Sequence, residues 1–299
     1  MELGLTLVGD ATDTTPAEAS AAFLELCRTA EQSGLQTLWF TEHHHNPTRM
    51  SSTIPVLMAA AGAQTSLNLG AATLLPGLHD TTRMAESMGT LESLYPGRLL
   101  WGFGKGGRSE ILYTHLEHIT PENAREEMMR NLRSLLALRG SEEVMPPLSH
   151  DTPWFVATRD TAAVQLAAEN GLGVMFGHKW PLEELVGIVS TYRSAHPEGR
   201  APAIMLSRYF LCDSDGEQVQ RRMTEEVGKR REHMRRRGRS LGEASGEGIR
   251  FRESLVGTPQ ECRERMAYFR AMGVTHLSLR PVSTCHEDTA ASLVMLAQR

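Results

Sequence analysis

Short apolar runs alternate with amphipathic stretches along the whole chain, and this alternation constrains the fold more than any other feature of the sequence. Eight of the runs have the length and residue content of β-strands. The expected strands are Glu2 to Val8, Thr37 to Thr41, Asn68 to Leu75, Leu99 to Phe103, Trp154 to Ala157, Gly173 to Phe176, Ala203 to Cys212 and Thr275 to Leu279. Helical patterns between them include Pro16 to Ser33, Asp80 to Leu94, Pro121 to Leu138, Asp160 to Glu169, Leu182 to Ser194, Glu217 to Arg237 and Pro259 to Met272.

Strands that are apolar on both faces are typical of a parallel sheet that is covered on both sides, and helices provide its crossovers. The eight strands and their helices therefore predict an α/β fold, the (β/α)8 or TIM barrel, with residues 1–299 in one domain. Two segments depart from the simple pattern. The connection from Gly104 to Pro153 carries an inserted helix after the fourth strand, and the polar stretch from Arg235 to Arg252 is a loop insertion before the eighth strand.

Charge and cysteine content narrow the class of protein. The formal net charge of −5 argues against nucleic-acid binding and against a membrane-surface role, because both need a basic field. The first residues do not resemble an export signal, and no apolar run approaches the length of a membrane span. The four cysteines form no Cys-x-x-Cys pair, so neither a zinc site nor a disulfide framework is indicated. We therefore expect a cytoplasmic protein.

An acid and three consecutive histidines, Glu42, His43, His44 and His45, directly follow the second expected strand. In barrels of this type the active site lies at the carboxyl ends of the strands. Imidazole titrates closest to neutral pH, so a cluster of it there can transfer protons, bind a metal or stabilise an anion. We predict that Glu42, His43 and His44 are catalytic. The alternative is that one or two of them only bond to neighbouring loops.

A metal site is a weaker interpretation of the same cluster. Conceivable further ligands are His79, Asp80, His115 and His118. However, no pair of them has a helical spacing that is diagnostic of a divalent metal site. We predict no metal, and a metal-dependent hydrolase that uses the histidine cluster stays a distant alternative.

The ends of the third and fourth strands carry small residues. Gly104 and Gly106 let the backbone approach a planar ring or an anion closely, with Lys105 as a charge partner. The alternative is a tight turn needed for barrel closure. Ala72 and Thr73 leave space for a ligand at the barrel mouth, or else permit close packing of a helix.

The end of the fifth strand has the composition of a phosphate site. Thr158, Arg159 and Thr161 stand at the start of an expected helix, where hydroxyl groups, a guanidinium and unpaired amides favour an anion. The alternative is ordinary capping of that helix by Asp160 or Thr161.

Taken together, these segments resemble the luciferase-like flavin monooxygenase superfamily, which includes bacterial luciferase, alkane and sulfonate monooxygenases and deazaflavin-dependent oxidoreductases. The matching pieces follow the family's order over about residues 3 to 280. They are Ala30 to Leu35 with Leu38 to His44, Leu67 to Pro76, Pro96 to Leu99 with Gly102 to Gly106, Val256 to Cys262, and Gly273 with Val274.

The resemblance implies roles for individual residues of this chain. His43 would lie beside the reactive edge of the flavin, with His44 and Glu42 assisting it. Lys105 would contact the flavin phosphate, and Thr158 and Arg159 would add contacts from the end of strand five. The peptide bond between Ala72 and Thr73 matches a non-prolyl cis peptide beneath the ring. His178 or Trp180 would place an aromatic ring against the flavin.

The implied activity is that of the oxygenase component of a two-component monooxygenase. Reduced FMN, supplied by a separate flavin reductase, would react with dioxygen to a flavin hydroperoxide that oxidises a small or medium organic substrate. Alternatives are a deazaflavin-dependent oxidoreductase on the same barrel and a flavin-binding protein without turnover. Gly104 stands where luciferase has a cysteine, so light emission is not expected. Relatives pair through their second and third helices, and the small residues Met58 to Ala63 fit such a homodimer.

Overall fold

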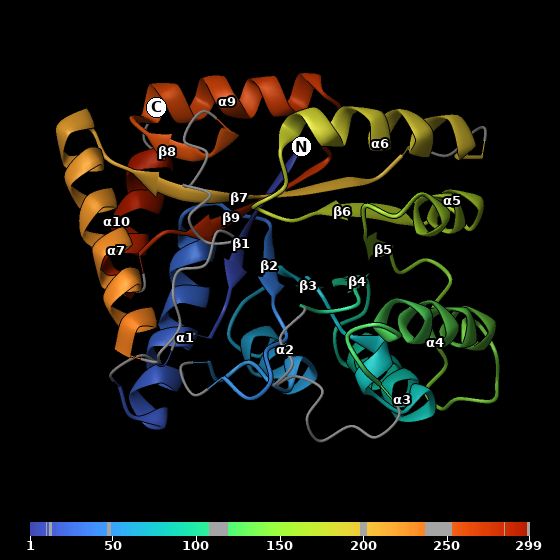
Figure 1. Cartoon of the computed structure of the whole chain (residues 1–299). Coiled ribbons are helices and arrows are strands. Elements are labelled where there is room, and N and C mark those ends of the chain that lie inside the picture. Colours follow the sequence, from blue (N-terminus) through green and yellow to red (C-terminus); the bar gives the residue numbers. More distant parts are fainter. Residues whose placement is uncertain are drawn as a thin grey trace.

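Eight parallel strands close into a barrel in this computed structural model (Figure 1), which describes residues 1–9, 11, 14–46, 49–107, 119–197, 202–236, 253–283 and 285–297. The barrel strands are β1 Glu2–Leu7, β2 Thr37–Phe40, β3 Asn68–Ala71, β4 Leu99–Phe103, β5 Trp154–Ala157, β6 Gly173–Phe176, β7 Ile204–Cys212 and β9 His276–Pro281. Their order is β6-β5-β4-β3-β2-β1-β9-β7, and pairing of β7 with β6 closes the ring. The predicted TIM barrel is confirmed.

Helices surround the strands (Figure 1). They are α1 Pro16–Gln32, α2 Ile54–Gly62, α3 Thr81–Leu94, α4 Ala124–Leu138, α5 Thr161–Glu169, α6 Leu182–Ala195, α7 Gly216–Arg236, α9 Pro259–Ala271 and α10 His286–Ala297, with a short 3-10 turn at Pro76–Leu78. The starts of α1 and α9 are set by sequence. Thr15 and Thr258 each form a capping box with the glutamate three residues later, and a proline occupies the first turn.

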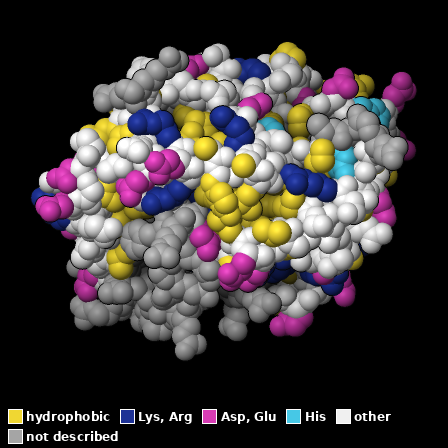
Figure 2. Space-filling model, turned by 90° about the horizontal axis from the view of Figure 1, so that it is seen from above, with side chains coloured by type: hydrophobic (Ala, Val, Ile, Leu, Met, Phe, Trp, Pro, Cys, Tyr) yellow, Lys and Arg dark blue, Asp and Glu magenta, His cyan; other side chains and the backbone are white. Residues whose placement is uncertain are grey.

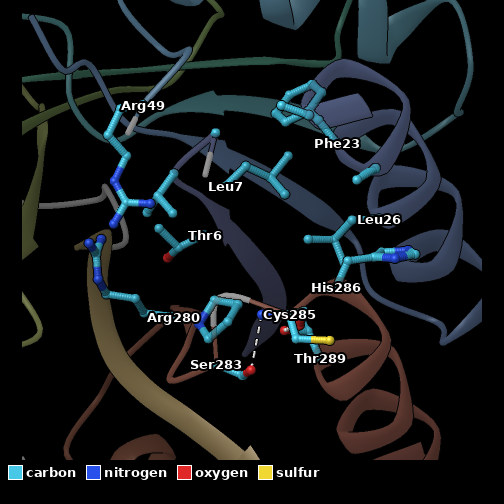
Figure 3. Close-up of a pocket in the computed structure, with 15 residues that line it drawn as sticks. Thr6, Leu7, Phe23, Leu26, Arg49, Arg280, Ser283, Cys285, His286 and Thr289 are labelled. Carbon is cyan, nitrogen blue, oxygen red and sulfur yellow. Dashed lines mark hydrogen bonds between the residues drawn. The ribbon is translucent and has the colours of Figure 1, made fainter. Parts of the chain in front are cut away.

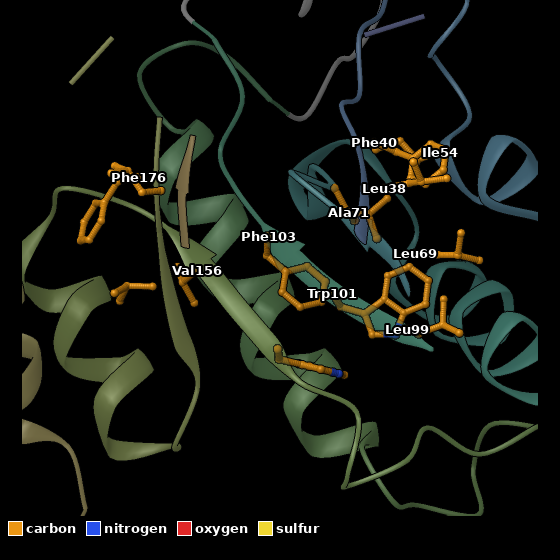
Figure 4. Close-up of a cluster of buried hydrophobic side chains, with 14 of the residues drawn as sticks. Leu38, Phe40, Ile54, Leu69, Ala71, Leu99, Trp101, Phe103, Val156 and Phe176 are labelled. Atoms are coloured by element: carbon orange, nitrogen blue, oxygen red, sulfur yellow. The ribbon is translucent and has the colours of Figure 1, made fainter. Parts of the chain in front are cut away.

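Alternate residues of each strand face the helices and the barrel interior. Leu38 and Phe40 of β2 belong to the large cluster that packs the strands against the helices (Figure 4), whereas Trp39 packs inside with Phe155 and other apolar side chains. Gly70 of β3 lies opposite Trp39 in the strand register, and a side chain there would collide with the indole ring. The indole therefore fills the barrel interior because its neighbour has no side chain.

The structure corrects several expected boundaries. β3 ends at Ala71 rather than Leu75, because the chain turns away there and Leu74 forms only an isolated bridge to Phe103. A short strand, β8 Leu255–Gly257, was not expected. It pairs with the last residues of β7, which extends past the barrel, so it adds a ninth strand outside the ring. Helices α2 and α10 were also not among the helical patterns, and residues 237–252 of the expected insertion lie outside the described residues.

Several helices expose a large apolar side chain. Val56 near the start of α2 and Leu94 at the end of α3 are two of these. Val186 of α6 and Tyr268 of α9 are exposed on the helices at the top of Figure 1. Figure 2 views the molecule from that side and shows hydrophobic side chains in the middle of the face, surrounded by charged ones.

Candidate active site

A cavity of about 660 Å³ lies at the carboxyl ends of the barrel strands. It brings together three of the predicted segments. Glu42, His43 and His44 follow β2, Ala72 and Thr73 follow β3, and Gly106 follows β4. Residues that the sequence analysis did not single out complete the wall: Thr6, Met175, Phe176, Ser207 and Arg280. Arg280 could have been found, because it directly follows the expected eighth strand.

Glu42 is a buried carboxylate at the centre of a hydrogen-bond network. Nε2 of His44 and Nε2 of His79 each lie 2.6 Å from its Oε1, and the amide of Leu75 donates to its Oε2 at 2.9 Å. Burial raises the pKa of Glu42, but the hydrogen bonds and charges of the two histidines outweigh it, so this pKa lies below its usual value. An ionised carboxylate only accepts hydrogen bonds, so both Nε2 atoms donate.

His79 is the residue of this network whose role the sequence analysis missed. Burial lowers the pKa of His79, but the hydrogen bond to Glu42 and the negative charge of Glu42 together raise it by more. The net shift of this pKa is therefore upward. His79 is 37 positions from Glu42, and nothing in the local sequence indicates that they meet. Only the neighbouring positions of β2 and β3 in the closed barrel bring the two side chains together.

His43 has a different environment from His44. Its side-chain Nε2 is buried and has no hydrogen-bond partner among the described residues. Burial, together with the positive charges of Arg280 and Arg49, lowers the pKa of His43 to about 4. The imidazole is therefore neutral at physiological pH, and His43 is one of the residues that line the cavity. A buried polar atom without a partner is rare and indicates a site that is completed by a ligand or water.

Glu42, His44 and His79 are also the described residues whose ligand atoms converge within 4.8 Å, as a metal site requires. The 2.6 Å separations are hydrogen-bond distances, so the structure accounts for the three groups without an ion. Asp80, another conceivable ligand, instead caps α3 by accepting from the amide of Arg83. His115 and His118 lie outside the described residues.

The ends of β3 and β4 meet closely. The peptide bond between Ala72 and Thr73 is cis, as the resemblance implied. The amide of Gly104 donates to the carbonyl of Leu74, and a Cβ on Gly104 would lie 2.6 Å from Oγ1 of Thr73. Gly104 therefore supports the cis segment from behind, while Gly106 borders the cavity and Lys105 between them is half-buried.

The end of β5 shows helix capping. Asp160 accepts from the amide of Ala163 at the start of α5 and pairs with Arg125 at 2.8 Å. Arg159 pairs with Glu184 at 2.9 Å and lies over the ring of Trp180. Among the described residues Ala157 lines the cavity, whereas Thr158, Arg159 and Thr161 stand outside its wall. A phosphate role for these three residues therefore stays a prediction.

His178 and Trp180 were alternatives for an aromatic contact with a ligand. His178 lines the cavity and packs edge-on against Tyr209, with the ring centres 4.7 Å apart. Trp180 packs against Phe176 and Arg159. Of the two, His178 has the position that such a contact needs.

A closed barrel with an ionisable cluster at the carboxyl ends of its strands defines a TIM-barrel enzyme. The chain belongs to the luciferase-like monooxygenase family, whose pattern matches residues 1–276. The resemblance to the luciferase-like family is thereby confirmed.

Several curated proteins are similar to this chain in sequence. A luciferase-like monooxygenase of Escherichia coli strain K12 is 27% identical over 186 residues, which cover 59% of this chain and 55% of that protein. The matched segments cover 56%, 52% and 55% of three such curated relatives, about half of their length.

Two solved structures illustrate the shared fold. The monooxygenase RslO1 from Streptomyces bottropensis has a TM-score of 0.84 and 22% identity, with 99% of this chain and 98% of that chain covered. The oxygenating constituent of 3,6-diketocamphane monooxygenase from Pseudomonas putida, in complex with FMN, has a TM-score of 0.76 and 18% identity, with 100% and 97% covered.

None of the helices in the described part of the chain has both the length and the apolar character that crossing a bilayer requires.

Proposed function

We propose that this protein is the FMN-dependent oxygenase component of a two-component monooxygenase that acts on a small or medium organic substrate. The observation that carries the proposal is that His43, with its buried and unpartnered Nε2, lines the same cavity as Ala72, Thr73 and Gly106. Three of the segments whose resemblance implied flavin contacts, those after β2, β3 and β4, therefore border one cavity.

The cavity fits a flavin ring. Its volume of about 660 Å³ lies within the range of small-molecule sites. Ala72, Ala157, Met175 and Phe176 supply an apolar wall for a flat aromatic system. The backbone at Gly106 can approach a ligand without a side chain in the way. We assign the ring to this wall and the phosphate to Lys105, Thr158, Arg159 and Thr161.

Reduced FMN would supply the electrons with which dioxygen is activated. The protein's own contribution is proton handling and exclusion of water. His43 can accept or donate a proton at Nε2, because it is neutral and that atom has no competing partner among the described residues. Glu42 holds the neighbouring His44 in a fixed orientation through the 2.6 Å hydrogen bond.

The same proposal includes partners. A separate flavin reductase would deliver the reduced flavin, and dioxygen would be the second substrate. We further propose a homodimer through α2 and α3 and a cytoplasmic location, as the sequence analysis predicted.

Anaerobic titration with reduced FMN, followed by mixing with oxygen, tests the proposal. We expect one FMN per chain and a delayed return of oxidised-flavin absorbance compared with free FMN. Reduced deazaflavin, titrated in parallel, decides between the two cofactor alternatives. A protein that binds neither cofactor, or that leaves flavin oxidation as fast as in free solution, would contradict the proposed oxygenase. Tight binding with no substrate oxidation would favour a flavin-binding protein without turnover.

A further inference from the structure

The two sides of the cavity differ in polarity. The side formed by β3, β5 and β6 is apolar and is the wall that we assign to the flavin ring. Across the barrel, β1, β7 and β9 contribute Thr6, Ser207 and Arg280, with Met205 of β7 as an apolar residue among them. Thr6 is buried, and its Oγ1 lies 2.5 Å from the hydroxyl oxygen of Ser278 on the neighbouring strand. A ligand in this cavity therefore meets hydroxyl groups and a guanidinium on the side opposite the apolar wall.

A second, smaller cavity of about 90 Å³ adjoins this polar side and shares Thr6 and Arg280 with the first. Arg49, from the segment that follows β2, also lines it. Figure 3 shows the guanidinium groups of Arg49 and Arg280 on the same side of Thr6, although they come from separate elements. Two positive charges therefore lie at the junction of the two cavities.

The effect of these charges reaches the main cavity. Arg280 and Arg49 are the charged groups that most strongly disfavour protonation of His43. The carboxylate of Glu42 has the opposite effect on the pKa of His43, but a smaller one. The two guanidinium groups near His43 therefore favour an anionic ligand on this side of the cavity.

We propose that Arg280, with Arg49 behind it, binds the carboxylate of an organic-acid substrate at the junction of the two cavities. Arginine matches a carboxylate with two parallel hydrogen bonds, which fixes orientation as well as position. Held there, the substrate lies next to His43 and faces the apolar wall. This inference rests on the proposed function for the location of the flavin, and it adds the substrate class.

Benzoate and benzamide are matched probes, because they have the same shape and differ in charge. Their affinities for the flavin-free protein are measured by calorimetry for the unchanged chain, Arg280→Gln, Arg280→Lys and the control Arg221→Gln, which removes an exposed charge from α7. We expect a preference of about tenfold or more for benzoate, consistent with a charged hydrogen bond. Arg280→Gln should abolish the preference, Arg280→Lys should retain part of it, and the control should keep it.

Equal preference for benzoate in the unchanged chain and in Arg280→Gln would overturn the inference, as would equal affinity of the unchanged chain for both probes. The ratio of FMN to riboflavin affinity separates the two possible anions. We expect Arg280→Gln to leave this ratio unchanged, and a fall in it would assign Arg280 to the flavin phosphate and overturn the inference. Loss of FMN binding with intact benzoate preference would contradict only the proposed function.

Discussion

The protonation state of His43 follows from its surroundings rather than from its neighbours in sequence. Four residues in a row can titrate or bind metals, yet burial and two arginines give His43 a pKa of about 4 while Glu42 engages His44. The sequence predicted that the cluster carries chemistry. It could not predict this division of roles, because Arg49, Arg280 and His79 reach the cluster only in the closed barrel.

Replacement of His43 tests its role in the reaction. We expect His43→Ala to accelerate the return of oxidised-flavin absorbance by about a hundredfold, the lower end of what a positioned acid or base contributes. The matched control is His150→Ala, which removes an exposed imidazole before β5, at the other end of the strands. Stopped-flow absorbance measures the change, and identical kinetics in both variants would count against His43.

The pH dependence of stability tests the buried neutral state. The pKa of His43 falls from an ordinary 6.5 to about 4 in the folded chain, so the unfolded state binds more protons between these values. The free energy of unfolding therefore rises with pH across this window. The stability that comes from keeping His43 neutral is complete above pH 6.5 and is lost as the pH falls to about 4. Compared with His43→Gln, the unchanged chain should gain up to about 3 kcal/mol between pH 4 and 6.5. Urea unfolding at both pH values measures this difference, and parallel curves for the two proteins would contradict the assignment.

At the scale of elements, the contact between the loops after β3 and β4 depends on a missing side chain. Gly104→Ala should place a methyl group against Oγ1 of Thr73, whose branched side chain has little freedom to move. We expect a loss of about 1 to 3 kcal/mol in the free energy of unfolding and weaker FMN binding. Gly107→Ala is the control, because a Cβ there meets no atom of the described residues within 4 Å. Similar unfolding curves for the two variants would show that the close contact is not needed.

Elements with a clear period were the ones that sequence could predict. The strand Gly173 to Phe176 has the same limits in the structure. The helix expected from Glu217 to Arg237 begins one residue earlier, and its expected last residue lies outside the described residues. Helix α2 was expected only from the resemblance, through the small residues Met58 to Ala63, because Ile54 to Gly62 is apolar on all sides and shows no amphipathic repeat. The three residues of β8 are too few to show alternation, and their strand exists only because β7 continues beyond the barrel.

At the scale of the whole molecule, exposed apolar residues on α2 and on α6 give two candidate positions for a dimer interface. We expect Val56→Asp on α2 to convert a dimer into a monomer, because it places a charge in the face that we assign to the partner. Val186→Asp makes the same change on α6, one of the helices at the top of Figure 1. Light scattering after gel filtration measures the mass. If only Val186→Asp dissociates the dimer, the interface includes α6 and not α2. If the unchanged chain is a monomer, the proposed homodimer is excluded.

The fold itself was the most predictable level, because eight apolar strands joined by helices have few other ways to cover both faces of a sheet. The sequence predicted that the site lies at the carboxyl ends of the strands, but it did not predict which side chains face the cavity. Strand ends showed where His43, Thr73 and Gly106 would gather, whereas Thr158 and Arg159 stand outside the described wall. Whether a strand-end residue faces the cavity depends on the turn that follows it, which no periodic pattern specifies.

The indole of Trp39, which packs against Gly70, affects how ligands can reach the cavity. Together with Phe155 and Met205 it fills the centre of the barrel, so among the described residues the barrel axis is packed below the main cavity. Ligands therefore reach this cavity from the carboxyl ends of the strands and not along the barrel axis. FMN, dioxygen and an organic acid would then share the same entrance, and the order in which they bind and are released would affect the turnover rate.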